Sequence, residues 1–259
     1  MKDLVLFIPT YKRDAVRTLE QFPKQILKKV IVVVQKGDRK RLKGKLPKQV
    51  KTLVLPKEIT TIAPTRKFIG EHAKELGYKK FVMMDDDLKF FRRKVEGSHK
   101  LQPVEDQDLV DMFTWMSEIL DTHAHCGISA REGNGHVHDD FVINTRMMRV
   151  IGYRTAMFNY VKHNRLQVME DFDVTLQLLR LGCENIVNFT FANNQLGGSN
   201  SKGGCSEFRT LKVQRKAALK LEKLFPDFVT AYKKKSKSAW NGKERTDVRV
   251  QWKKAHNVT

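Results

Sequence analysis

Short apolar runs alternate with amphipathic stretches along most of this 259-residue chain. Unbroken apolar runs are typical of strands that are buried on both faces, as in parallel sheets covered by helices. The pattern predicts strands at 4–8, 30–34, 50–55, 81–84, 127–129, 141–144 and 186–192. Strands that alternate with helices indicate an α/β fold with a mostly parallel sheet flanked by helices.

Helical spacing of apolar residues marks the segments between these strands. The clearest case is 103–122, where Leu109, Met112 and Met116 fall on one side of a helix. The segment 64–77 is also predicted as a helix, because Gly77 is a typical helix stop. Shorter helices are predicted at 14–25 and 171–181.

The composition changes at Gly197, which opens a glycine-rich loop and then a basic helix predicted at 208–225. We predict a catalytic unit over 1–195, and a lid loop with a basic helical C-terminal extension over 196–259 in the same folding unit. The loop lacks the ending of a Walker motif. It either closes over a donor phosphate, with Arg209 as a phosphate contact, or serves as a simple linker.

Positive charge dominates the chain, with 49 Lys and Arg against 29 Asp and Glu and a net charge of +20. This excess favours a polyanionic partner such as nucleic acid, because neutralised phosphates release counterions. The alternative is charge that serves only solubility.

No apolar run is long enough to span a bilayer, so no membrane is expected. Three scattered cysteines fit a reducing cytoplasm and match no zinc pattern.

Three consecutive carboxylates, Asp85, Asp86 and Asp87, follow the apolar run at 81–84. They place negative charge at the carboxyl edge of the sheet, where open α/β sheets bind ligands. Adjacent like charges repel, so the arrangement costs stability unless a cation lies among them. Mg²⁺ or Mn²⁺ would suit these oxygen ligands and often carries substrate phosphates. The alternative is a solvated acidic turn.

Hydroxyl and basic side chains follow the first predicted strand, at Pro9, Thr10, Tyr11 and Arg13. Such a loop can hold a nucleotide base or phosphate, although this composition is common at strand exits. Arg66 lies near the N-terminus of the helix predicted at 64–77, where the helix dipole disfavours a cation. An anionic ligand or the acids themselves would relieve that conflict, and ordinary surface charge is the alternative.

Two further groups of polar residues are candidates for chemistry. Glu170 and Asp171 open a predicted helix, where acids serve as caps or, at the mouth of a site, as a general base. The potential metal ligands His136, His138, Asp139 and Asp140 match no fixed spacing, so a solvated or acceptor-facing loop is the favoured interpretation.

Four motifs occur in an order that resembles the GT-A class of nucleotide-sugar-dependent glycosyltransferases across residues 1–195. They are the strand exit at 8–13, Arg66, the acids at 85–87 and the pair at 170–171. The segments 170–180, 203–210 and 249–254 narrow the resemblance to the TET-associated DNA glycosyltransferases of phages, over almost the whole chain. That family is implicated in attaching sugars to 5-hydroxymethylpyrimidines in phage DNA.

The resemblance implies a role for each matching residue. Asp85 and Asp87 would hold Mn²⁺ or Mg²⁺ on the diphosphate of a nucleotide-sugar donor, expected to be a UDP-sugar, and Asp86 would contact the ribose. Asp171, with Glu170, would be the catalytic base of an inverting enzyme. The expected donor contacts are Pro9, Thr10, Tyr11, Arg13, Arg66 and Arg209.

The acceptor implied by the family is DNA that contains hydroxymethylated pyrimidines, in the host cytoplasm during phage infection. Cationic and aromatic residues of the tail suit a flipped base and its flanking phosphates. The expected DNA contacts are Lys233, Lys234, Lys235, Trp240, Arg249, Trp252 and Lys253. The alternatives are a GT-A enzyme that modifies a glycan or protein, and a non-catalytic nucleic-acid-binding protein.

One feature departs from many GT-A enzymes, which supply a late histidine to the metal. No histidine lies between His163 and His256 in this chain. Asn193, Asn194, water or a loop residue would then complete the metal shell, or the dependence on metal is weak.

Overall fold

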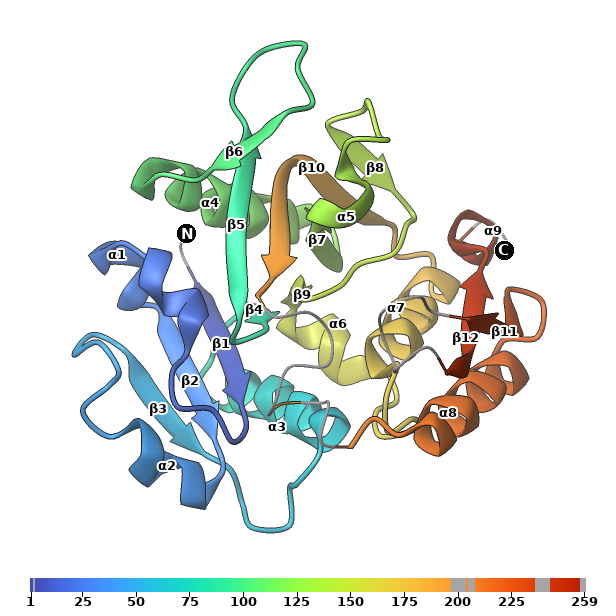
Figure 1. Ribbon diagram of the computed structural model, residues 1–259, viewed down its shortest axis with the longest axis horizontal. Helices are drawn as coiled ribbons and strands as arrows, with labels where there is room; N and C mark the ends of the chain where they lie inside the picture. Colours follow the sequence, from blue (N-terminus) through green and yellow to red (C-terminus); the bar gives the residue numbers. More distant parts are fainter. Residues whose placement is uncertain (2, 197–203, 205–207, 236–242, 257–259) are drawn as a thin grey trace.

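Ten strands form one mixed sheet with helices on both faces (Figure 1). The computed structural model describes residues 1, 3–196, 204, 208–235 and 243–256. The sheet has the order β3-β2-β1-β4-β9-β7-β10-β5-β6, and β8 pairs with β10. Its strands are β1 (Leu4–Thr10), β2 (Val30–Val34), β3 (Lys51–Val54), β4 (Lys80–Met84), β5 (Leu88–Arg93), β6 (Leu101–Pro103), β7 (His125–Ala130), β8 (Phe141–Ile143), β9 (Val150–Arg154) and β10 (Asn185–Gln195).

The N-terminal half of the sheet is entirely parallel, as the unbroken apolar runs predict. β3, β2, β1 and β4 pair in that order, and β7 and β10 form a further parallel pair. β9, which no sequence pattern predicted, pairs antiparallel with both β4 and β7 and joins these two parts. β5 also runs antiparallel to β10 and extends the far edge of the sheet.

Alternate side chains of β1 enter two different hydrophobic clusters, so both faces of the sheet are buried. Leu4, Leu6 and Ile8 pack in the cluster that includes α4. Val5 and Phe7 pack in the opposite cluster, which includes residues of α3 and α7. An α/β sheet with helices on both faces is therefore confirmed, and it aligns the ends of its parallel strands at one edge.

The helices cover the sheet, with one clear departure from the sequence prediction. The predicted helix at 14–25 is wrong as one element: a 3₁₀ turn at Arg17–Gln21 and a short α1 flank Pro23, which lacks the N–H needed to continue a helix. The others are α1 (Lys24–Leu27), α2 (Lys36–Leu42), α3 (Ile62–Glu75), α4 (Asp106–Thr122), α5 (Arg131–Asn134), α6 (Thr155–Tyr160), α7 (Glu170–Arg180), α8 (Leu211–Leu224) and α9 (Trp252–His256).

The C-terminal elements pack on α7 through a third hydrophobic cluster. After α8, two antiparallel strands, β11 (Val229–Lys235) and β12 (Glu244–Val250), form a separate hairpin (Figure 1). The expected helical extension is therefore only partly helical. The run Lys233 to Lys235 gives β11 a charge pattern that hid its strand character in the sequence.

Candidate active site

A cavity opens where β1 and β4 end and α7 begins. Open α/β sheets bind ligands at this carboxyl edge. The cavity is lined by all the residues assigned to the donor, to the pair of acids on the metal, or to catalysis: Pro9, Thr10, Tyr11, Arg13, Arg66, Asp85, Asp86, Asp87, Glu170, Asp171 and Arg209. The fold thus brings together side chains from widely separated parts of the sequence.

The three acids form the tight connection between β4 and β5, which runs from Met84 to Leu88. The Asp85 N–H donates to the Arg149 carbonyl at 3.0 Å, and the Thr18 hydroxyl donates to the Asp85 carbonyl at 2.7 Å. The Thr18 hydroxyl also accepts the N–H of Leu88 at 2.9 Å. These bonds fix the backbone of the connection, and its three carboxylates line the cavity.

Residues at the end of β1 hold two of these acids. Thr10 Oγ1 donates to Asp86 Oδ2 at 2.5 Å. Arg13 Nη2 donates to Asp87 Oδ2 at 3.1 Å, and Arg13 Nε lies 3.5 Å from Asp86 Oδ1. Gln195, the last residue of β10, donates to the same Asp87 oxygen at 3.3 Å. The predicted donor loop therefore offsets part of the repulsion within the acidic triplet.

Two carboxyls of the triplet hold their protons more tightly than usual. Burial raises the pKa of Asp85 to about 6; Arg66 opposes the rise and Asp87 adds to it. Burial likewise raises the pKa of Asp86 to about 6, although the hydrogen bond from Thr10 and the charge of Arg13 work in the other direction. A bound cation would favour the ionised forms and lower both pKa values.

An ion pair connects the N-terminal part of α3 to the start of α7. Arg66 Nη1 lies 3.0 Å from Glu170 Oε1, and both side chains are largely buried. Burial opposes the charge of Arg66, but Glu170, Asp171 and Asp85 outweigh it and raise the Arg66 pKa. Burial raises the pKa of Glu170, against the attraction of Arg66. The acids thus relieve the unfavourable position of a cation at a helix N-terminus.

Asp171 lies in the first turn of α7, beside an unusual backbone conformation. Met169, the residue that precedes α7, is left-handed with a φ of 64°, which is uncommon for a non-glycine residue. Asp171 is half-buried and accepts the Phe172 N–H at 3.1 Å. Its negative charge also acts on Arg146, whose pKa is nevertheless lowered because burial dominates.

Three residues that were not predicted from the sequence also line the cavity: Arg146, Arg149 and Gln195. The Arg146 guanidinium lies 4.8 Å from the centre of the Phe172 ring, and Arg149 pairs with Glu132 at 3.1 Å. Both arginines lie near the start of β9, which was not predicted, so no strand exit pointed to them. The arginines counter the acids across the cavity and supply donors for a phosphate.

The C-terminal side of the cavity is closed by contacts with the loop after β1. The Gly204 N–H donates to the Tyr11 carbonyl at 2.9 Å, and the rings of Tyr11 and Phe208 lie 5.2 Å apart. Arg209 follows and lines the cavity. The rest of the predicted lid, 197–203 and 205–207, lies outside the described residues.

The acids offer oxygen ligands to a divalent cation, but they form no complete set. Among the described residues, no group of three or more His, Cys, Asp and Glu side chains is arranged to hold a metal ion. Asp87 Oδ1 is buried and has no hydrogen-bond partner within the described part of the chain. Asn193 donates to the Ser129 carbonyl at 2.9 Å, and neither Asn193 nor Asn194 is among the residues that line the cavity.

The predicted DNA-binding residues of the tail lie apart from this lining. Lys233, Lys234 and Lys235 are exposed on β11, and Arg249 and Lys253 are also exposed. Arg249 lies 5.7 Å from the centre of the Tyr232 ring.

Of the two tryptophans in the tail, the structure describes only Trp252. Trp252 packs on Phe172 with ring centres 5.3 Å apart and belongs to the third hydrophobic cluster, so its ring stabilises α7 and the tail. Trp240 lies outside the described residues.

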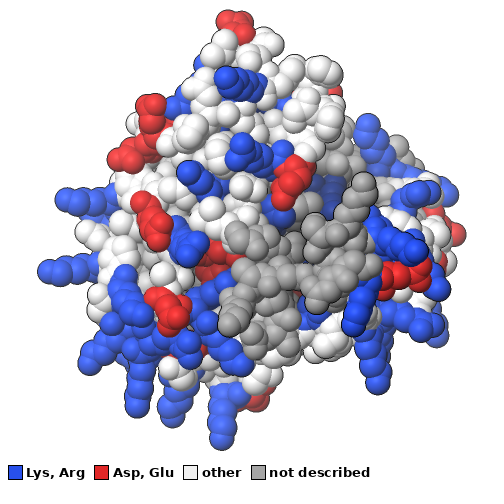
Figure 2. All heavy atoms as spheres, viewed as in Figure 1, with Lys and Arg blue, Asp and Glu red and all other residues white. Residues whose placement is uncertain are grey.

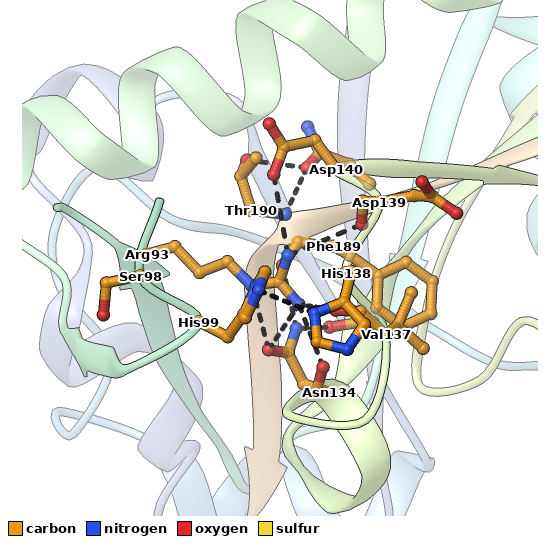
Figure 3. Close-up of polar contacts among 12 residues, drawn as sticks. Arg93, Ser98, His99, Asn134, Val137, His138, Asp139, Asp140, Phe189 and Thr190 are labelled. Atoms are coloured by element: carbon orange, nitrogen blue, oxygen red, sulfur yellow. Dashed lines mark hydrogen bonds and ion pairs between the residues drawn. The ribbon is translucent and has the colours of Figure 1, made fainter. Parts of the chain in front are cut away.

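The histidine-rich loop at 136–140 is organised by Arg93, a buried residue of β5 (Figure 3). Arg93 donates to the Val137 carbonyl at 2.7 Å and to the side chain and carbonyl of Asn134. His138 Nδ1 lies 2.9 Å from His99 Nε2. Residues 138–140 are exposed, as is His136, so this loop is open to solvent, as both the solvated and the acceptor-facing interpretations require.

The described helices include none with the length and apolar character required to cross a membrane.

The acids that follow β4 and the acids that open α7 share one cavity at the edge of a mixed α/β sheet, and with the family match over residues 4–204 they make this chain a GT-A-like glycosyltransferase. The family model of the TET-associated glycosyltransferases matches residues 4–204, and this chain belongs to that family. No curated protein sequence matches it.

Solved structures of similar shape share little sequence with this chain. GalNAc-T7, bound to UDP, GalNAc and Mn²⁺, is 9% identical over 74% of this chain and 43% of its own, with a TM-score of 0.47. A Desulfovibrio desulfuricans G20 protein, provisionally classed as a nucleotide-diphospho-sugar transferase, is 13% identical over 86% and 98% (TM-score 0.44). The mannose-1-phosphate geranyltransferase of Thermus thermophilus is 9% identical over 60% and 58% (TM-score 0.40). The chain thus spans less than two thirds of the length of the first and third proteins. Sequence and structural similarity this low adds nothing to the assignment of the family.

Proposed function

We propose that this glycosyltransferase moves a sugar from a nucleotide-sugar donor to the hydroxymethyl oxygen of a 5-hydroxymethylpyrimidine in DNA. The observation that carries the proposal is the shared cavity of two acidic groups. Asp85 lies at the end of β4, Glu170 and Asp171 lie at the start of α7, and Arg66 stands between them. The acid at the end of β4 suits the donor, and the acids at the start of α7 suit the acceptor hydroxyl.

The donor side of the cavity combines acids with arginines. Asp85 and Asp87 would hold Mn²⁺ or Mg²⁺, a role that the buried and unpartnered Asp87 Oδ1 fits. Such a cation, when bound, neutralises the departing diphosphate. Arg146 and Arg209 line the same cavity and suit the phosphate oxygens. The nucleoside, expected to be uridine, would lie against the loop that follows β1.

The acceptor side rests on Asp171. In an inverting transfer, the hydroxymethyl oxygen bonds to the anomeric carbon of the sugar as the bond from that carbon to the diphosphate breaks. The nucleoside diphosphate leaves with the electron pair of the broken bond, and the acceptor proton passes to the Asp171 carboxylate. Glu170 is tied to Arg66, so it would position Asp171 and α7 while Asp171 remains the base.

The choice of DNA as acceptor rests on the family and on charge. The chain carries a net charge of +20, which favours a polyanion through counterion release. Lys and Arg side chains gather over α2 and β3 at the lower left of Figure 2, and over α8 and the hairpin at the lower right. Extrusion of the base from the duplex would give the cavity access to its hydroxymethyl group.

The test is a transfer assay on DNA that contains 5-hydroxymethylcytosine or 5-hydroxymethyluracil, with Mn²⁺ or Mg²⁺ and a panel of nucleotide sugars. Mass spectrometry of the digested nucleosides should show a sugar added to the modified base alone. DNA with unmodified cytosine and thymine is the control. Absence of sugar on DNA with every donor, together with transfer to a glycan or protein, would overturn the DNA assignment.

A further inference from the structure

A second groove lies beside the active-site cavity, between the start of α3, the segment 164–167 and one face of α8. In Figure 1 these elements meet below α7. The groove is lined by Thr61, Ala63, Pro64, Asn164, Arg165, Leu166, Gln167, Val213, Lys216, Ala217 and Lys220. Neither the predicted donor site nor the predicted DNA-binding tail includes these residues.

The groove lies next to the active-site cavity, and the two hollows share one wall. Thr61 lines both hollows, and its neighbour Ile62 faces the active-site cavity while Ala63 faces the groove. The segment 164–168 is also part of this wall, because Val168 lines the cavity and Gln167 lines the groove. The two hollows are therefore neighbours, and a chain molecule whose reactive group enters the cavity would reach the groove by passing over this shared wall.

The charge of the groove is positive. No Asp or Glu is among its described lining residues. Arg165 is neutralised by an ion pair with Asp173, to which its Nε donates at 3.0 Å. Lys216 and Lys220 are exposed and have no acidic partner among the described residues. These two lysines therefore supply the net charge of the groove.

The two lysines belong to a longer row on α8. Lys212, Lys216, Lys220 and Lys223 follow one another at spacings of four, four and three, and all are exposed. Residues four apart in a helix lie on one side, about 6 Å apart along its axis. The row can therefore track a chain of phosphates, whereas a single small anion would need only one or two of these positions.

Neutral polar groups on the opposite wall complete the chemistry. Asn164 and Gln167 are exposed amides, and Thr61 carries a hydroxyl at the residue that precedes α3. Hydroxyls, amides and helix N-termini all bind phosphate oxygens and sugars without reading base sequence.

We infer that this groove binds the sugar-phosphate backbone of the acceptor strand next to the modified base, an inference that rests on the proposed function. Lys216 and Lys220 pair with phosphates, and Asn164 and Gln167 contact the backbone from the other wall. This assignment moves the principal DNA contact from the hairpin to α8. Lys233 on the hairpin already pairs with Glu244 at 3.1 Å.

The test compares the variant Lys216→Gln/Lys220→Gln with the control Lys24→Gln/Lys28→Gln, which removes two exposed lysines, also four residues apart, that line neither the cavity nor the groove. Each enzyme is assayed on a hydroxymethylated oligonucleotide and on the free hydroxymethylated nucleoside. We expect the groove variant to raise the ratio of the oligonucleotide KM to the nucleoside KM at least several-fold. The control should keep the wild-type ratio.

Salt dependence provides the second readout. Loss of two phosphate contacts should lower the slope of log K for oligonucleotide binding against log salt by roughly 0.7 to 0.9 per lysine. The variant Lys216→Arg/Lys220→Arg keeps the charge and should restore both the slope and the KM ratio. Donor binding, measured by calorimetry, reports whether each variant is folded.

The outcomes separate this inference from the proposed function. If wild-type enzyme transfers sugar to neither acceptor, the proposed function fails. If it transfers sugar but the groove variant and the control behave alike in KM ratio and salt slope, the groove assignment is overturned.

Discussion

The Glu170 carboxylate lies 3.0 Å from the guanidinium of Arg66, and this pair joins the two helices that border the active site. Both side chains are largely buried, with 13% and 17% of their surfaces exposed. Removal of one partner from a buried pair leaves an uncompensated charge, which costs more than the pair itself contributes. The pair therefore fixes where α7 begins, and with it the position of Asp171.

Replacement of Arg66 by alanine should destabilise the protein, because Glu170 would remain buried without its partner. We expect the free energy of unfolding in urea to fall by roughly 3 kcal/mol. Lys67→Ala is the matched control, since Lys67 pairs with Glu71 on an exposed part of the same helix. Its loss should stay below about 1 kcal/mol. Similar losses in both variants would contradict a structural role for the buried pair.

Replacement of Asp171 by asparagine should lower kcat by roughly 100- to 10,000-fold, because the amide cannot accept the acceptor proton. Donor affinity should stay near the wild-type value, as the acids of the β4–β5 connection remain. Single-turnover transfer and calorimetry with the nucleotide measure the two quantities. A variant with near wild-type kcat would exclude Asp171 as the base.

The rate of transfer should rise with pH through about 6 and then level off. Burial raises the pKa of Asp85, one of the two proposed metal ligands, to about 6, and its carboxylate form is needed to hold a cation. Below that pH we expect the rate at subsaturating metal to fall by up to about tenfold per unit. Higher metal concentration should shift the profile to lower pH, and a profile insensitive to metal would oppose this assignment.

The stability of the metal-free protein should fall as the pH rises, whereas the rate of transfer should increase. Asp85 and Asp86 bind protons more tightly in the folded state than at the ordinary value of 3.8. The free energy of unfolding should therefore decrease as the pH rises from about 4 to about 6. The variant Asp85→Asn should show a smaller decrease in urea titrations at the two pH values, and an unchanged decrease would count against the raised pKa.

Replacement of Gly70 by alanine should destabilise α3. A Cβ at this position would lie 2.3 Å from the Phe158 ring, which packs in the second hydrophobic cluster. Such crowding typically costs about 1 to 3 kcal/mol of unfolding free energy. Gly37→Ala in α2 is the control, because nothing lies within 4 Å of its added Cβ. Thermal unfolding of the two variants should separate them clearly.

The sequence by itself determined the parallel strands, the long helices and most of the candidate active site. Unbroken apolar runs define β1, β2 and β4 because the residues of a strand buried on both faces are all apolar. Asp85 to Asp87 were found because they follow such a run directly. Once the strands are parallel, residues at their ends must meet at one edge, which places the loop after β1 beside the acids.

Only the tertiary structure decided which other residues complete the site. Arg146 and Arg149 reach the cavity because β9 inserts antiparallel beside β4, and no local pattern records that pairing. The sequence suggested Trp252 as a base-stacking surface, whereas long-range packing places it on Phe172. The groove at Lys216 likewise exists only because α8 packs beside the segment at 164–167. Local sequence encodes periodicity and strand ends, but contacts between distant segments depend on how the whole chain buries its apolar surface.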